Sequence, residues 1–160
     1  MTNLKRTAIT IIGAAILFIS SGVATAQDVY YSPGNNQVKL GIEAMEAQNF
    51  EQASKRFNNA LRLTVGPKTR AIVLNNLCAV DYQREALEQA LRACNQAVRT
   101  NKKDWRALAN RGNVYVAMGE FTKAKDSFER ADRINPNISG VKKYLAEYSR
   151  TTKTQFASGK

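Results

Sequence analysis

Hydrophobic and small residues recur at the spacing of one helix face from Gln37 to Ser149, and short polar segments interrupt the pattern. Residues 27–36 combine proline, glycine and asparagine without any period, and they predict a flexible N-terminal segment. Residues 151–160 also lack a period, and we expect them to form a disordered tail. The pattern therefore predicts one all-α domain over residues 37–150.

The helical pattern itself repeats along the chain. One triplet of core-type residues, spaced as i, i+4 and i+7, occurs three times. Its copies are Ala53, Phe57 and Ala60; Ala90, Cys94 and Ala97; and Ala124, Phe128 and Ala131. The second and third copies lie 34 residues apart, whereas the first and second lie 37 apart because the loop around Gly66 is longer. A period of this length predicts a stack of similar helical units.

The third copy carries the fullest set of matching residues. They are Trp105, Leu108, Gly112, Tyr115, Gly119, Phe121, Ala124, Phe128, Ala131 and Pro136. With these residues and this period, the chain resembles the tetratricopeptide repeat family. The second copy supplies Leu74, Leu77, Cys78, Leu87, Ala90, Cys94 and Ala97, and the first supplies Leu40, Gly41, Ala44, Phe50, Ala53, Phe57 and Ala60. The first copy departs from the family at Ala44 and the second at Asp81, where the third copy has a tyrosine.

The resemblance implies an α-solenoid of three helix hairpins, in units of about residues 34–67, 71–104 and 105–138. A stack of repeats needs a capping element over its last apolar face. One apolar stripe of a final helix follows Pro136 and consists of Val141, Tyr144, Leu145 and Tyr148. We therefore expect a C-terminal capping helix over residues 139–150.

The first 26 residues have the pattern of a secretory signal peptide. Lys5 and Arg6 precede an apolar run, and Ala24, Thr25 and Ala26 follow it with the small residues that a signal peptidase requires. We expect cleavage after Ala26 and a periplasmic or secreted protein. The alternative is an uncleaved anchor, because residues 7–27 carry no charge and are long enough to cross a bilayer.

The composition excludes most enzyme classes. The 160 residues include no histidine, which removes the commonest general base, the usual base for a nucleophilic serine or cysteine, and a common zinc ligand. The carboxylates are scattered, and the repeat register brings no pair of them together. We therefore predict a protein that is not an enzyme and that needs no cofactor or metal.

The chain is strongly basic. Lys and Arg number 24 against 13 Asp and Glu, and the net charge of +11 falls to +9 when Lys5 and Arg6 leave with the signal peptide. The densest cluster comprises Arg99, Lys102, Lys103 and Arg106. Such clusters are most often solvated surface, and the functional interpretation is attraction to an anionic partner. Nucleic acid is not expected as that partner, because the chain has no platform of clustered aromatic residues.

The two cysteines lie 16 residues apart in the second unit, one on each helix of the expected hairpin. Export places Cys78 and Cys94 in an oxidising compartment, so we predict a disulfide between them. The alternative is a pair of buried free thiols that act as small hydrophobic residues. A redox-active pair is disfavoured, because the cysteines do not form a Cys-x-x-Cys motif.

The resemblance also implies a binding surface for peptides or partner helices along the first helix of each hairpin. In repeat register it selects Lys39, Asn75, Asn76, Tyr82, Arg106, Asn110 and Asn113. Asparagine amides both donate to and accept from a peptide backbone, and Lys or Arg binds a carboxylate. Asn76 and Arg106 match the carboxylate clamp of chaperone-binding members, but Val38 and Ile42 replace its Lys and Asn. A full clamp is therefore not expected, and the alternative role for these asparagines is solvation or the capping of turns.

These observations predict a periplasmic scaffold that binds a protein or peptide partner in a concave groove, with an acidic partner favoured by the basic side chains. The alternative is a basic envelope-associated protein that binds an anionic surface or polymer through its charge. The identity of the partner and the oligomeric state stay open.

Overall fold

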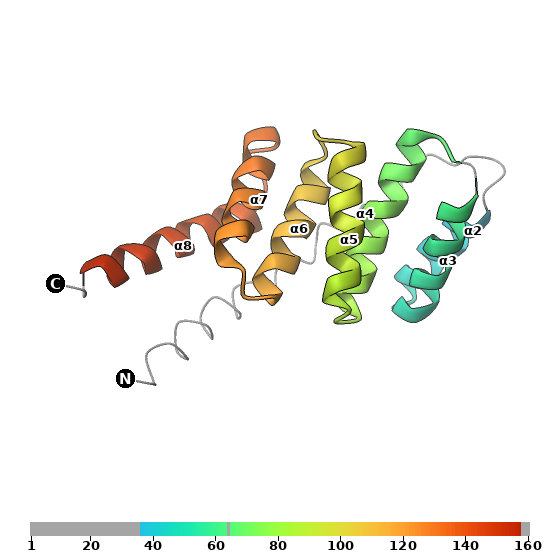
Figure 1. Ribbon diagram of the computed structural model, residues 1–160, viewed down its shortest axis with the longest axis horizontal. Helices are drawn as coiled ribbons and strands as arrows, with labels where there is room; N and C mark the ends of the chain where they lie inside the picture. The colour runs from blue at the N-terminus through green and yellow to red at the C-terminus, as the bar shows by residue number, and fades with distance from the viewer. Residues whose placement is uncertain (1–35, 64, 158–160) are drawn as a thin grey trace.

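A computed structural model describes residues 36–63 and 65–157 of the chain. The described residues form seven α-helices: α2 (Asn36–Glu46), α3 (Phe50–Arg62), α4 (Pro67–Gln83), α5 (Leu87–Thr100), α6 (Trp105–Ala117), α7 (Phe121–Ile134) and α8 (Ser139–Ala157). They pair into three helical hairpins that stand side by side, with α8 at one end of the row (Figure 1). We call α2, α4 and α6 the A helices, and α3, α5 and α7 the B helices. The expected all-α solenoid of three hairpins and a capping helix is confirmed.

Two helix boundaries differ from the expected ones. Helix α4 starts at Pro67, four residues before the expected start of the second unit. Proline is favoured at the first helical position because its φ is already helical and the N–H that it lacks would have no partner within the helix. Helix α8 continues to Ala157, so residues 151–157 are helical and do not belong to a disordered tail. The sequence from 151 to 157 contains no glycine or proline that would end a helix earlier. The expected signal peptide and residues 27–35 lie outside the described residues.

All three A-to-B turns have a residue in the left-handed backbone conformation at the same position. Gln48, Glu85 and Gly119 have φ of 57°, 58° and 75°, and each is the second residue after its A helix. Only the third turn has glycine, which adopts this conformation without a clash at Cβ. The other two turns keep the repeat geometry with residues that pay a steric penalty for it.

The helices of each hairpin meet at one close contact. A Cβ atom added to Gly41 would lie 2.6 Å from Phe57, and one added to Gly112 would lie 2.6 Å from Phe128. The first and third hairpins therefore pair a glycine on the A helix with a fully buried phenylalanine on the B helix. The second hairpin has Cys78 and Cys94 at the same two repeat positions, both fully buried.

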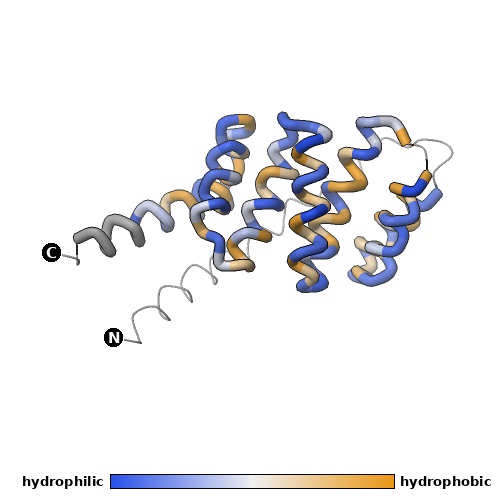
Figure 2. Tube along the Cα trace, in the orientation of Figure 1, coloured by the Kyte–Doolittle hydropathy of each residue, from blue (hydrophilic) through white to orange (hydrophobic). Residues whose placement is uncertain are grey.

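The capping helix completes the core at the C-terminal end. Val141 and Tyr144 of α8 are 0% and 3% exposed, and the ring of Tyr144 lies 4.5 Å from that of Phe128 on α7. Hydrophobic and hydrophilic residues alternate along the hairpin helices, and none of these helices is apolar all round (Figure 2). The middle hairpin packs against both of its neighbours, and its helix α4 has no exposed residue from Ala71 to Tyr82.

Candidate functional site

The residues expected to bind a partner all lie on the three A helices. Asn75 on α4 and Asn110 on α6 bond directly to each other, since Asn110 Nδ2 donates to Asn75 Oδ1 at 2.9 Å. This bond joins successive A helices and uses polar groups that a ligand would otherwise contact. Asn75 and Asn110 therefore have a structural role in the unbound chain.

Asn76 and Asn113 are different. Nδ2 of Asn76 and Oδ1 of Asn113 are buried, and neither has a hydrogen-bond partner within the described part of the chain. Leaving a buried polar group unpaired costs about 1–3 kcal/mol, so native proteins contain few such groups. One of these atoms is a donor and the other an acceptor, which together match the polar groups of a peptide unit.

The asparagines are more buried than the sequence predicts. Asn75, Asn76 and Asn113 are 3%, 1% and 7% exposed, although we expected them to line an open surface. The reason is the close packing of A helices, which lets α4 and α6 share a side-chain hydrogen bond. A partner would reach Asn76 and Asn113 only through a local side-chain rearrangement.

The other three expected binding residues are more accessible. Lys39 is exposed and forms an ion pair of 3.7 Å with Glu43 on the same helix. Arg106 is half-buried, and its guanidinium lies 4.6 Å from the centre of the Trp105 ring. Burial raises the pKa of the half-buried Tyr82 above its ordinary value of 10.0, so its hydroxyl keeps its proton and can donate a hydrogen bond.

The structure places the sulfur atoms of Cys78 on α4 and Cys94 on α5 at disulfide-bonding distance, with Cα atoms 5.1 Å apart. This geometry agrees with the predicted pairing. The cross-link lies between the two helices of the middle hairpin, at the position that a phenylalanine fills in the other two.

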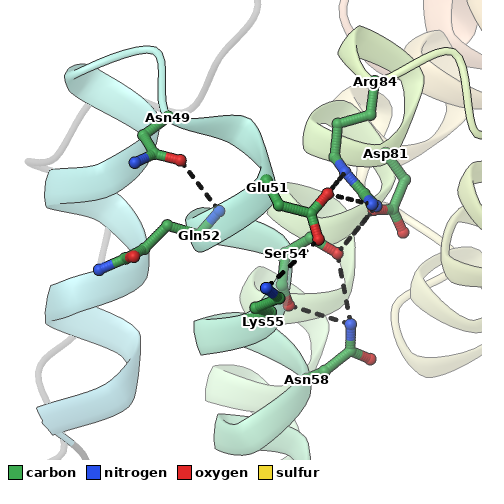
Figure 3. Close-up of polar contacts among 8 residues, drawn as sticks. All are labelled: Asn49, Glu51, Gln52, Ser54, Lys55, Asn58, Asp81 and Arg84. Carbon is green, nitrogen blue, oxygen red and sulfur yellow. Dashed lines mark hydrogen bonds and ion pairs between the residues drawn. The ribbon is translucent and has the colours of Figure 1, made fainter.

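A polar cluster joins the first hairpin to the second (Figure 3). Ser54 Oγ on α3 donates to Asp81 Oδ1 on α4 at 2.8 Å. Arg84 donates from Nη1 to Asp81 Oδ1 at 2.9 Å and from Nε to Glu51 Oε2 at 2.9 Å. Its guanidinium thus bridges a buried carboxylate and an exposed one. The hydrogen bond and charge of Arg84 hold the pKa of Glu51 below its ordinary value of 4.5.

This cluster corrects the expectation that no two carboxylates come together. Glu51 and Asp81 belong to different hairpins, and they meet only because Arg84 in the α4–α5 turn reaches both. The sequence did contain a signal, since Asp81 replaces an apolar or aromatic residue of the repeat. A polar residue at a core position requires a buried partner. The contacts are those of a bridge between helices, and we assign the cluster no chemical step.

A second polar bridge joins the last two B helices. Arg111 on α6 donates from Nε to Ser127 Oγ on α7 at 3.1 Å, and its Nη1 lies 3.4 Å from Asn95 Oδ1 on α5. Burial lowers the pKa of Arg111 from its ordinary value of 12.5. The other two hairpins have Leu40 and Leu77 at the repeat position of Arg111. The repeat pattern alone therefore predicts a hydrophobic residue at this position.

The described residues contain no group of three or more His, Cys, Asp or Glu side chains placed to hold a metal ion. Among the same residues, no helix is both long enough and apolar enough to cross a bilayer.

Residues 26–143 match the protein family described as "Tetratricopeptide repeat-like domain". Over 91 residues the chain is 34% identical to the "Ancillary SecYEG translocon subunit" of Haemophilus influenzae, which covers 57% of this chain. The chain spans 44% of that relative's length. Over 85 residues it is also 26% identical to human "Peptidyl-prolyl cis-trans isomerase FKBP4", covering 53% of this chain and 18% of that relative.

Solved structures share the fold at low sequence identity. One is described as "First TPR of Spaghetti (RPAP3) bound to HSP90 peptide SRMEEVD", with a TM-score of 0.65, 18% identity, and coverage of 73% of this chain and 90% of that one. Another is described as "Crystal structure of PcrH in complex with the chaperone binding region of PopB", with a TM-score of 0.61, 17% identity, and coverage of 76% and 96%. These likenesses establish the repeat fold.

Proposed function

Because the chain belongs to the tetratricopeptide repeat-like family, we propose that it is a non-enzymatic scaffold that holds a segment of a partner protein against its A helices. One observation supports this most: Asn76 and Asn113 bury a donor and an acceptor that nothing in the described chain satisfies. A peptide segment would supply both complementary groups and remove the penalty of the unbound state. Structures of the same fold have been described with bound peptides, which is consistent with this role.

We propose further that the partner segment carries a carboxylate. Lys39 and Arg106 lie on A helices at opposite ends of the row of three, and both are cations on the same set of helices as the asparagines. Arginine binds carboxylates through two parallel hydrogen bonds, and Arg106 is already held against Trp105. An acidic segment thus fits this face better than a basic one.

The experiment is affinity co-purification from an extract of the source cells, with Asn76→Ala and Asn113→Ala combined in one variant. Each lost hydrogen bond should weaken binding by roughly fivefold to tenfold, so the double variant should recover little partner. The matched control carries Asn59→Ala and Gln96→Ala, which remove two exposed amides from B helices. Equal recovery by both variants would exclude the A-helix face as the binding surface.

We also propose that the chain acts outside the cytoplasm, in the periplasm or secreted, after cleavage following Ala26. The basic, apolar and small-residue order of residues 1–26 supports this, as does the name of the relative from Haemophilus influenzae. N-terminal sequencing of the protein from the envelope fraction should begin at Gln27. Recovery of the chain with Met1 in place would contradict cleavage.

A further inference from the structure

Charge is divided between the two edges of the hairpin row. The B-to-A connections lie along one edge, the upper one in Figure 1, and the A-to-B turns lie along the other. We call residues 62–63, 65–70, 99–106 and 133–138 the loop edge, and residues 46–51, 84–88 and 118–123 the turn edge. The loop edge has eight basic residues and one acidic residue, whereas the turn edge has five acidic residues and two basic ones.

The basic residues of the loop edge are almost all exposed. The exposed ones are Arg62, Lys68, Arg70, Arg99, Lys102, Lys103 and Arg133. Arg99, Lys102 and Lys103 take part in none of the ion pairs that form between described residues. The one carboxylate of this edge, Asp104, caps α6 by accepting from the backbone N–H groups of Arg106 and Ala107.

Helix stability explains only part of this charge. Arg62, Arg99 and Arg133 lie in the last turns of B helices, where a cation stabilises the negative end of the helix dipole. Lys68, Arg70 and Arg106 lie in the first turns of A helices, where a cation opposes the dipole. No acidic residue occurs in the first turn of α4, α6 or α8. Stabilisation of the helix dipoles therefore does not account for all of the positive charge at the loop edge.

The same edge also carries exposed aliphatic side chains. Leu63 and Ile134 are 48% and 40% exposed, and they are the large hydrophobic residues that the described part of the chain leaves exposed. Each directly follows an arginine at the end of a B helix, Arg62 and Arg133. Two hairpins thus present an arginine and an aliphatic side chain side by side at the loop edge.

We infer that the loop edge docks on the surface of an anionic lipid bilayer, with its Lys and Arg side chains on the headgroups and Leu63 and Ile134 in the interfacial layer. Basic residues near an anionic membrane each strengthen binding, and aliphatic side chains bury at the boundary between headgroups and acyl chains. A soluble polyanion offers charge but no apolar phase for the aliphatic pair. Arg106 belongs to both proposed surfaces, but the docking does not depend on the proposed partner, because Arg99, Lys102 and Lys103 lie outside the A helices.

The test measures binding of the full chain, and in parallel of the form that begins at Gln27, to two kinds of vesicle. One kind is phosphatidylcholine alone, and the other is phosphatidylcholine mixed with phosphatidylglycerol. Preference for the anionic vesicles is the quantity of interest, since any insertion of the apolar residues 8–19 would occur with both. We expect clear preference at low salt and its loss at high salt.

Three variants locate the surface. Arg99→Gln, Lys102→Gln and Lys103→Gln combined should weaken anionic vesicle binding by about 100-fold. The matched control, Arg92→Gln, Lys55→Gln and Lys123→Gln, also removes one arginine and two lysines, all exposed and off the loop edge, and should bind like the unaltered chain. Leu63→Ser with Ile134→Ser should weaken binding on the order of tenfold without a change in net charge.

Several results would overturn the inference. Equal losses in the loop-edge variant and its control would mean that only net charge matters. Full binding by the Leu63 and Ile134 variant, together with tight binding of soluble polyphosphate, would identify a polyanion and not a membrane as the ligand. A third result would be a chain that forms dimers and does not bind vesicles, with the dimer lost in the loop-edge variant. The loop edge would then bind the acidic turn edge of a second copy and not a membrane.

Discussion

At the scale of single residues, the side chains that depart from the repeat pattern carry the most information. Asn76 is almost fully buried, and its Nδ2 donates no hydrogen bond within the described residues, which favours a role in binding a partner over a role in stabilising the fold. Asp81 occupies a buried position with two partners, which favours a role within the fold. Both are buried polar residues on α4, and only their hydrogen bonds distinguish them.

The first prediction concerns Asn76. Asn76→Leu should raise the free energy of unfolding by about 1 kcal/mol, because it replaces an unpaired buried amide with an apolar side chain of similar size. The same change should reduce partner recovery, since the amide is lost. Urea denaturation measures the first effect and co-purification the second. A loss of stability in Asn76→Leu would mean that the amide serves the fold.

The second prediction concerns the turn at Glu85, whose φ of 58° is costly for a residue with a Cβ atom. Glu85→Gly should stabilise the chain by up to about 1 kcal/mol, as Gly119 does in the third turn. Glu88→Gly, three residues later in the first turn of α5, should instead destabilise the chain by a similar amount. Thermal unfolding of the two variants should shift the midpoint in opposite directions.

The third prediction concerns pH. The pKa of Glu51 is lower in the folded chain than its ordinary value of 4.5, so its contribution to stability is present above that value and is lost as the pH falls through the folded-state pKa. Glu51→Gln should therefore lower the denaturation midpoint at pH 7, and this effect should shrink as the pH falls below 4.5. The matched control is Glu85→Gln, which removes an exposed carboxylate from the neighbouring turn.

At the scale of helices and hairpins, the middle repeat is built differently from its neighbours. A glycine and a phenylalanine close the first and third hairpins, whereas Cys78 and Cys94 close the second. Two cysteines fill less space than a phenylalanine does, and the cross-link compensates by constraining the unfolded chain. The two solutions use the same pair of repeat positions.

The fourth prediction tests this equivalence. Cys78→Ser with Cys94→Ser should lower the free energy of unfolding by about 3 kcal/mol. Cys78→Gly with Cys94→Phe should recover much of that loss, because it rebuilds the packing of the other hairpins. Urea denaturation with and without reductant measures both effects. Reductant should weaken only the unaltered chain, and a chain of equal stability in both conditions would contradict the cross-link.

The sequence predicted these hairpins well because their signal is periodic. Ala53, Phe57 and Ala60 and their two sets of counterparts identify the B helices, and all nine residues are buried. The polar contacts were less predictable. The Asn75–Asn110 bond and the Arg84 bridge depend on how far apart successive repeats pack, which a pattern within one repeat does not specify. The burial of Asn76 was missed for the same reason.

At the scale of the whole molecule, the two proposed surfaces differ in physical character. The A-helix face combines buried amides with two cations, whereas the loop edge carries eight basic residues, all but Arg106 exposed, and two exposed aliphatic side chains. Charge on an exposed edge is screened by salt, and hydrogen bonds in a buried site are screened much less. One solution variable therefore separates the two activities.

The fifth prediction follows from this contrast. Raising the salt concentration from about 0.1 M to 1 M shortens the screening length from about 10 Å to 3 Å, so binding to anionic vesicles should disappear. Partner recovery should fall much less over the same range. Parallel salt series on one preparation would show this, and loss of both activities together would indicate that charge drives both.

Because a disulfide closes the middle hairpin, the final structure of the chain depends on whether its compartment is oxidising or reducing. Before oxidation, the second hairpin has neither the phenylalanine that fills its neighbours nor the covalent bond that replaces it. In a reducing compartment the centre of the row is thus its weakest part, and the outer hairpins are held together less firmly. For a chain that is exported as proposed, oxidation would be the last assembly step, because the disulfide would form only in the oxidising compartment.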